Sequence, residues 1–239
     1  MKAMILAAGL GSRLQHLTQD KPKALVEVKG MTLLERSIRT LIKAGVNEII
    51  INIHHFAPQV REFVAQHPFD AHISFSDETA LLLDTGGGIK QAAWFLKDSN
   101  PFIVYNVDII TDLNIKKMLA AHRENHCLAT LAVRKRETQR YLLFDNTMRL
   151  CGRYNAKTEE KTLLFGEETN CTPFAFSGIH VISPEIFAFM PDKEVFSITN
   201  LYMEMAATKK ITGYKHQEGY WMDMGKLQSL EDVNQLKLE

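Results

Sequence analysis

The sequence lacks features that would each indicate a particular class of protein. Lysine and arginine together number 28, as do aspartate and glutamate, so the chain has none of the basic excess that nucleic-acid binders carry. No apolar run approaches membrane-spanning length, and the run at the N-terminus is too short for the core of a signal peptide. We therefore expect a soluble protein that binds neither nucleic acid nor a membrane.

Cysteine is also scarce. Cys127, Cys151 and Cys171 are odd in number and far apart in the sequence, and no C-x-x-C pair occurs. Small secreted proteins that depend on disulfides usually carry an even number of cysteines at regular spacings. The cysteine pattern therefore favours a reduced, cytoplasmic protein over a secreted one.

Several common site motifs are absent too. No G-x-x-x-x-G-K-[ST] phosphate loop occurs, and Leu14 stands where a dinucleotide-binding G-x-G-x-x-G motif needs its third glycine. The string HRENH at residues 122–126 lacks the glutamate of the zinc motif H-E-x-x-H. His54 and His55 are neighbours at the end of a predicted strand, and adjacent strand residues face opposite sides. We expect the histidines to pack in the core or lie at the surface rather than to bind a metal.

What is present is an alternation of strand-like and helix-like patterns, which over the first ~110 residues is typical of a doubly wound α/β sheet. A chain of 239 residues suffices for one large domain, and no linker or repeat divides it. Predicted strands cover residues 3–8, 48–53, 71–76, 101–107, 128–134, 141–145, 174–182 and 211–217. Predicted helices begin near residues 33, 58, 86, 184, 197 and 226, and the charged stretch 157–161 is predicted to be a solvated loop.

The stretch at residues 3–25 concentrates groups suited to bind phosphate. Gly9 and Gly11 follow a strand-like run, and a turn of that kind can aim successive N–H groups at one anion. Arg13 adds a guanidinium that can form paired hydrogen bonds with phosphate oxygens. Lys23 follows a proline, so a second cation lies on a stiff segment. These residues predict a site for phosphoryl chemistry, although a tight turn with a surface arginine and lysine explains them equally when they are taken alone.

Three further segments can carry chemistry. Asp108 ends a predicted strand, where ligands of open α/β sheets bind, although a capping aspartate is common there. The glycines of Thr85–Ile89 start a predicted helix, so their N–H groups would be free and a flat base or ribose could approach closely. The segment Gly219–Gly225, which contains Asp223, reads on its own as an aromatic turn.

These strings together resemble the motifs of the sugar-1-phosphate nucleotidyltransferases. L-A-A-G-L-G-S-R-L at residues 6–14, followed by P-K-A-L at residues 22–25, is similar to the signature of that family. V-Y-N-V-D at residues 104–108 resembles its N-G-D strand end, with Val107 in place of the glycine.

The resemblance continues to about residue 235. G-Y-W-M-D-M-G at residues 219–225 resembles the family's W-x-D-x-G segment, and Phe176–Ile179 resembles its F-[ST]-G-I strand. The run L-x-T-G-G-G-I at residues 83–89 resembles that of short uridylyltransferases acting on N-acetylmuramate 1-phosphate, and that of related guanylyltransferases.

The resemblance implies a Rossmann-like, doubly wound mixed sheet of the nucleotide-diphospho-sugar transferase type, in a single domain at residues 1–239. Residues 1–110, approximately, would form the nucleotide-binding half, and residues 111–239 the sugar-binding half with the second metal ligand. The implied catalytic residues are Arg13, Lys23 and Asp108, and the implied ligands of Mg²⁺ are Asp108 and Asp223. Implied nucleotide-binding residues are Leu6, Ala7, Ala8, Gly9, Gly11, Ser12, Arg13, Lys23, Thr85, Gly86 and Gly87. Implied sugar-binding residues are Asn106, Ser177 and Gly178.

The implied reaction is transfer of a nucleoside monophosphate from an NTP, UTP ahead of GTP, to a sugar 1-phosphate with release of pyrophosphate. Guanylyl transfer to mannose 1-phosphate is the main alternative. A glycosyltransferase would typically carry a D-x-D metal motif, and Asp108 is followed by two isoleucines instead. A non-catalytic nucleotide sensor would keep the glycine turn but lose Lys23 or an aspartate, and none of these is lost.

Overall fold

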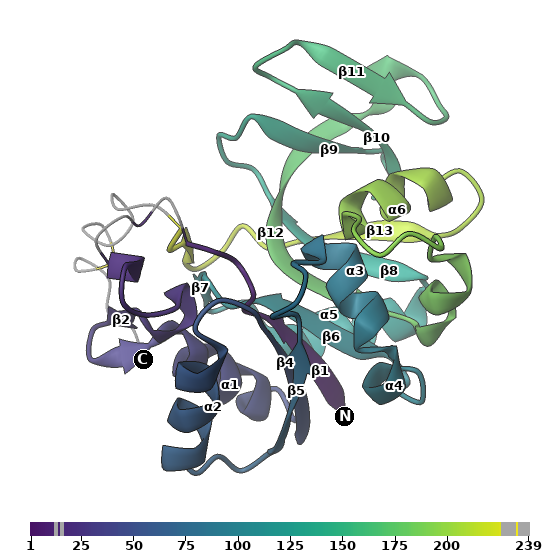
Figure 1. Cartoon of the computed structure of the whole chain (residues 1–239). Coiled ribbons are helices and arrows are strands. Elements are labelled where there is room, and N and C mark those ends of the chain that lie inside the picture. The colour runs from purple at the N-terminus through teal and green to yellow at the C-terminus, as the bar shows by residue number, and fades with distance from the viewer. Residues whose placement is uncertain (12–13, 15–16, 226–232, 234–239) are drawn as a thin grey trace.

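The strand-like runs assemble into one mixed sheet, described by a computed structural model that covers residues 1–11, 14, 17–225 and 233 (Figure 1). The strands are β1 (Lys2–Leu6), β2 (Glu27–Val28), β3 (Met31–Thr32), β4 (Glu48–Ile53), β5 (His72–Asp77), β6 (Phe102–Asn106), β7 (Ile109–Thr111), β8 (Ala129–Arg134), β9 (Arg140–Phe144), β10 (Leu150–Asn155), β11 (Glu160–Leu163), β12 (Thr172–Ile182), β13 (Ile211–Lys215) and β14 (Trp221–Asp223). The α-helices are α1 (Leu33–Lys43), α2 (Ala57–Gln66), α3 (Asp84–Gln91), α4 (Ala93–Leu96), α5 (Ile115–Glu124) and α6 (Ile198–Met205), and the 3-10 helices are η2 (Lys23–Leu25), η3 (Glu168–Asn170) and η4 (Pro184–Phe189).

The sheet combines a parallel half and an antiparallel half. Its strand order is β11-β10-β9-β12-β6-β1-β4-β5, and β8 lies beside β12 and carries β13. Strands β6, β1, β4 and β5 run parallel, whereas β12 is antiparallel to β6. Figure 1 shows the strands β9, β10 and β11 at one end of the molecule, and α1 and α2 packed beside β4 and β5 at the other.

Helices cover both faces of the parallel half, because its strands are apolar on both sides. Ile49 and Ile51 of β4 belong to the core shared with α1, α2 and α5, whereas Ile50 between them belongs to the core shared with α3, α4 and α6. Thr32 caps α1 by accepting a hydrogen bond from the Glu35 N–H at 3.1 Å, in keeping with the capping-box pattern of threonine followed three residues later by glutamate. The predicted doubly wound, mixed α/β fold is therefore confirmed.

Some local predictions differ from the structure. The helix expected over residues 86–96 breaks at Ala92 into α3 and α4. The charged stretch at residues 157–161 is only partly a loop, because Glu160 and Lys161 belong to β11. The short strands β2, β3, β7, β10, β11 and β14 were not predicted, since none of them is a long apolar run. The helix expected from residue 226 lies outside the described residues.

Within the part of the chain that the structure describes, no helix is long and apolar enough to cross a bilayer.

Candidate active site

The carboxyl ends of the parallel strands meet at one edge of the sheet. Leu6 ends β1 and is in register with Asn52 of β4 on one side and with Asn106 of β6 on the other. A cavity of about 400 Å³ lies at this edge. A Cβ added at Gly9 would meet no atom within 4 Å, so the turn after β1 is open there. The predicted residues that line the cavity are Leu6, Ala7, Ala8, Gly9, Lys23, Thr85, Asn106 and Asp108.

Lys23 and Asp108, which are 85 positions apart in the sequence, form an ion pair through Nζ and Oδ2. Lys23 is only 8% exposed, so this pair is largely shielded from water. Gly11 has a φ of +67°, and a Cβ added there would lie 3.1 Å from the Lys23 Cβ. Glycine thus lets the turn pass close over the segment that carries the lysine. Ser12 and Arg13, both predicted to bind phosphate, lie outside the described residues.

A buried network fixes the backbone of the turn. The N–H groups of Ala7 and Ala8 donate to Asn52 Oδ1 at 2.6 and 3.2 Å. Asn52 Nδ2 donates to Glu78 Oε1 at 2.8 Å, and Glu78 Oε2 accepts from the Leu83 N–H at 3.1 Å. Burial raises the pKa of the Glu78 carboxyl. The sequence analysis missed Asn52 and Glu78; the available signal was a polar residue at or just after the end of an apolar strand.

The short ladder between β7 and β14 places the backbones of Asp108 and Asp223 side by side. Asp223 is in register with Ile109, and the Met224 N–H donates to the Asp108 carbonyl oxygen at 2.8 Å. One or two carboxylates are the protein contribution that Mg²⁺ usually requires, with phosphate and water oxygens completing its octahedral shell. The described residues contain no group of three or more His, Cys, Asp or Glu side chains that could hold a metal without such help. The donor set therefore fits Mg²⁺ bound together with a phosphate substrate.

The glycine run of α3 is packed against protein, contrary to the expectation of free N–H groups. The N–H groups of Gly86 and Gly87 both donate to the Phe196 carbonyl oxygen, at 2.8 and 3.2 Å. A Cβ added at Gly87 would lie 2.0 Å from the Glu194 carbonyl oxygen, and one at Gly86 would lie 2.4 Å from the Phe196 ring. These two glycines are thus required for close packing, whereas Thr85 just before them lines the cavity.

A second cavity of about 690 Å³ continues from the first. The two cavities share Leu6, Asp84, Thr85 and Asn106, so one groove runs from the ends of β1 and β6 towards the strands β9, β10 and β11. The far wall of this second cavity comes from those strands, of which β9 was predicted and β10 and β11 were not. We call it the hairpin-side cavity.

Arginines distinguish the hairpin-side cavity. Arg136 stacks on the Trp221 ring, 4.3 Å from its centroid, and donates to the Phe176 carbonyl oxygen at 3.0 Å. Burial lowers the pKa of the Arg136 guanidinium. Arg140 is exposed, and its guanidinium has no ion pair or hydrogen bond among the described residues, while Arg153 reaches Asn200 Oδ1 at 3.4 Å. Of the three arginines, Arg140 is the most available to an anionic ligand.

Of the three predicted sugar-binding residues, only Asn106 lines the groove. Asn106 lines both cavities. Ser177 is fully buried and bonded to His216 Nε2 at 2.7 Å. Gly178 has a φ of +77°, and a Cβ there would lie 3.0 Å from Asn106 Nδ2, so it lies behind that side chain. On this strand Phe176, rather than Ser177, faces the hairpin-side cavity.

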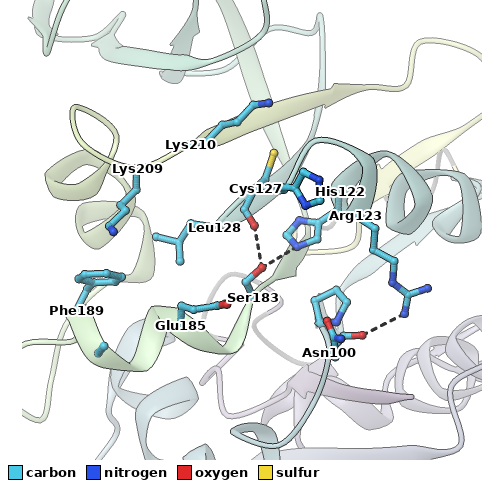
Figure 2. A pocket seen from close by; sticks show the side chains of 13 residues that line it. Asn100, His122, Arg123, Cys127, Leu128, Ser183, Glu185, Phe189, Lys209 and Lys210 are labelled. Carbon is cyan, nitrogen blue, oxygen red and sulfur yellow. Dashed lines mark hydrogen bonds between the residues drawn. The ribbon is translucent and has the colours of Figure 1, made fainter.

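Another cavity, of about 710 Å³, lies at the opposite edge of the sheet (Figure 2). Pro101, just before β6, and Leu128, just before β8, are part of its lining. Figure 2 shows Ser183 between the buried His122 ring and the Cys127 carbonyl oxygen, bonded to both. No residue predicted from the sequence to be functional lines this cavity, which is therefore separate from the candidate active site.

Comparison with known proteins agrees with the strand-end site. A family model described as nucleotidyl transferase matches residues 2–239. The chain belongs to this family. It is 33% identical over 233 residues to an N-acetylmuramate alpha-1-phosphate uridylyltransferase of Caulobacter vibrioides, covering 93% of this chain and 91% of that protein. It is 30% identical over 231 residues to a mannose-1-phosphate guanylyltransferase catalytic subunit beta of Dictyostelium discoideum, covering 94% of this chain and 61% of that protein.

The fold agrees as well. A crystal structure of a putative glucose-1-phosphate thymidylyltransferase from Bacillus anthracis superposes with a TM-score of 0.82 at 17% identity, covering 100% of this chain and 97% of that one. The predicted family, fold and reaction class are thus confirmed: this nucleotidyl transferase is a sugar-1-phosphate nucleotidyltransferase. The two curated relatives share that class but differ in base and in sugar.

Proposed function

We propose that this nucleotidyl transferase moves a uridylyl group from UTP to N-acetylmuramate 1-phosphate and releases pyrophosphate. The single observation that carries the choice of sugar is the free guanidinium of Arg140 in the hairpin-side cavity, next to the strand-end site. N-acetylmuramate 1-phosphate carries a carboxylate besides its phosphate, whereas mannose and glucose 1-phosphates do not. Charge-assisted hydrogen bonds to such a group are among the stronger polar contacts.

In the proposed reaction a phosphate oxygen of the sugar attacks the α-phosphorus of UTP. The bond from the α-phosphorus to the bridging oxygen breaks, and its electron pair leaves with pyrophosphate. No covalent enzyme intermediate is needed, because the attacking phosphate is already an anion. Catalysis then rests on holding two anions close together and neutralising their charge.

The turn after β1 and Lys23 are the groups proposed to hold the phosphates. Lys23 lies beside the open backbone at Gly9, and its Nζ is paired with Asp108. With Mg²⁺ on Asp108 and Asp223, the lysine charge would be released to the phosphates that converge at this edge. The metal, when bound, supplies further neutralisation of charge on the phosphate oxygens. Arg13 is proposed to bind the leaving pyrophosphate.

The proposed base is uracil. The uridylyltransferase relative matches this chain over 91% of its own length, whereas the chain spans only 61% of the guanylyltransferase. Thr85 and the backbone beside it, at the start of α3, are proposed to contact the nucleoside. A purine would need more room at this position than a pyrimidine.

The test is kcat/KM for UTP and GTP, each with four 1-phosphates: N-acetylmuramate, N-acetylglucosamine, glucose and mannose. N-acetylglucosamine 1-phosphate is the matched control, because it lacks the lactyl carboxylate. We expect UTP with N-acetylmuramate 1-phosphate to be the best pair, ahead of the control by about tenfold or more, since a hydrogen bond to a charged group contributes about 1.5–3 kcal/mol. A preference for GTP with mannose 1-phosphate would overturn the substrates but leave the reaction class intact.

A further inference from the structure

Two of the three cysteines meet in space although the sequence separates them. Cys151 and Cys171 are 20 positions apart, and their sulfur atoms lie 2.7 Å from each other. Cys151 lies on β10 and is buried, whereas Cys171 follows η3 and is half-buried. Cys127 lies elsewhere, with its sulfur 3.3 Å from the Thr212 hydroxyl. Separation along the sequence therefore does not show which of the thiols are neighbours in the fold.

We propose that Cys151 and Cys171 form a modification site, which reacts with a low-molecular-weight disulfide to give an intramolecular disulfide. The Cys171 thiolate attacks one sulfur of the reagent and releases one thiol. The Cys151 thiol then loses its proton, attacks the Cys171 sulfur and releases the second thiol. One disulfide is consumed and one is formed, so the step is balanced.

The order of the two steps follows from exposure. Cys171 is half-buried and so can be reached by a reagent, whereas Cys151 is fully buried. Burial and the neighbouring thiol raise the pKa of Cys151 to about 12, which makes it the slower thiol to ionise. Cys151 reacts only once the sulfur beside it is activated as a mixed disulfide.

The disulfide would link the two ends of the segment that forms a wall of the hairpin-side cavity. Arg153, Tyr154 and Asn155 of β10 and Thr162 of β11 line that cavity, and all lie between the two cysteines. Among the described strands β11 pairs only with β10, so little else restrains this part of the sheet. The disulfide would therefore hold the wall in the arrangement seen here.

The consequence for catalysis rests on the proposed function. A wall already held in place loses less conformational freedom when a sugar phosphate binds, so binding is tighter. We expect KM for N-acetylmuramate 1-phosphate to fall about two- to fivefold on oxidation, and KM for UTP to stay unchanged.

The site itself is tested by thiol counting on the full chain. The reduced protein is incubated with oxidised glutathione, alkylated with N-ethylmaleimide, weighed intact and digested with trypsin. We expect the alkylated thiols to fall from three to one, and the peptide at residues 150–153 to be linked to that at residues 162–193. Cys127→Ser should still form the link, and Cys171→Ser should not. Three alkylated thiols after treatment, or a link that includes Cys127, would overturn the proposal.

The coupling to the cavity is tested on the same samples by steady-state kinetics. An unchanged KM for the sugar phosphate in fully cross-linked protein would overturn the coupling, as would an equal response in Cys171→Ser. If no sugar 1-phosphate is turned over at all, the proposed function fails, while the thiol count still decides the modification site.

Discussion

The two ends of the groove, at the strand ends and at the hairpin-side cavity, are walled in different ways. At the strand ends, Lys23 and Asp108 form a shielded ion pair, and Asn52 and Glu78 tie the turn after β1 to its neighbours. On the side of β9, β10 and β11, the exposed Arg140 has a guanidinium with no ion pair or hydrogen bond among the described residues. The first wall is fixed by buried polar bonds, whereas the second presents an exposed charge at the start of β9. Under the proposed function, the strand ends would carry out the reaction, and the strands β9, β10 and β11 would select the sugar.

The largest effect should come from the carboxylates at the strand ends. Asp108→Asn and Asp223→Asn should each lower kcat by about 10²–10³, because each removes a charged oxygen that would hold Mg²⁺ next to the reacting phosphates. The exposed Asp70 provides a control, since Asp70→Asn should leave kcat unchanged. Activity of the unmodified protein that persists in excess chelator would contradict the metal assignment.

Lys23→Met should lower kcat by about 10²-fold and weaken UTP binding less, because its charge matters most when both phosphates converge. Arg13→Ala should weaken UTP binding as well, since the arginine is proposed to hold the bound triphosphate. Single-turnover kinetics separate binding from chemistry, and the exposed Lys97→Met serves as the control. Small, equal effects of Lys23→Met and Arg13→Ala would show that the phosphates lie elsewhere.

On the hairpin side, one change should alter sugar choice without abolishing the reaction. Arg140→Gln should lower kcat/KM for N-acetylmuramate 1-phosphate about tenfold, through loss of a charge-assisted hydrogen bond. The same variant should handle N-acetylglucosamine 1-phosphate as the unmodified protein does. Lys157→Gln, in the exposed turn between β10 and β11, is the matched control. Equal losses with both sugars would mean that Arg140 supports the wall rather than the carboxylate.

The same contrast explains what the sequence could predict. The parallel strands and the capped helix α1 were predictable, because local apolar patterns and caps agree with the fold. Lys23 and Asp108 were each singled out by their local sequence, but only the resemblance placed them in one site, since nothing local indicates that residues 85 positions apart would pair. The glycines of α3 were identified, but for the wrong physical reason: the carbonyl groups that pack against Gly86 and Gly87 come from residues 194–196. Long-range packing of this kind leaves no local pattern.

The strands β10 and β11, at one end of the sheet, were missed because their sequences lack an apolar pattern. β10 carries Arg153 and β11 carries Glu160 and Lys161, so neither is an apolar run. Their pairing is fixed by the ladder and by side chains such as Tyr141 and Tyr154, whose rings stack with centroids 6.2 Å apart across β9 and β10. Aromatic cross-strand pairs of this type stabilise a sheet but are recognisable only when the register is known.

The smallest effect should be a pH dependence of the free energy of unfolding, caused by the buried Glu78 at the strand ends. Burial raises the native pKa of Glu78 above 4.5, so the native state holds its proton at pH values where the unfolded state has lost it. The free energy of unfolding should therefore fall as pH rises from 4.5 through the native pKa of Glu78. The glutamine of Glu78→Gln carries no charge at any pH, so the free energy of unfolding of this variant should not show the decline. The variant should be less stable by about 1 kcal/mol at low pH, because a hydrogen bond is weakened.

Asp77, which precedes Glu78 in the sequence, provides a control because its contribution to stability should change with pH in the opposite direction. Hydrogen bonds from Thr79 lower the native pKa of Asp77, so its contribution to stability is present above pH 3.8 and is lost as pH falls through the native pKa. Urea unfolding of both variants and the unmodified protein over a pH series gives the comparison directly. The difference between unmodified protein and Glu78→Gln should shrink with rising pH, and that for Asp77→Asn should grow. If the difference in stability between the unmodified protein and Glu78→Gln does not change with pH, the Glu78 carboxyl ionises over the same pH range in the native and unfolded states. The strand-end site would then be no less hydrated than the hairpin-side cavity.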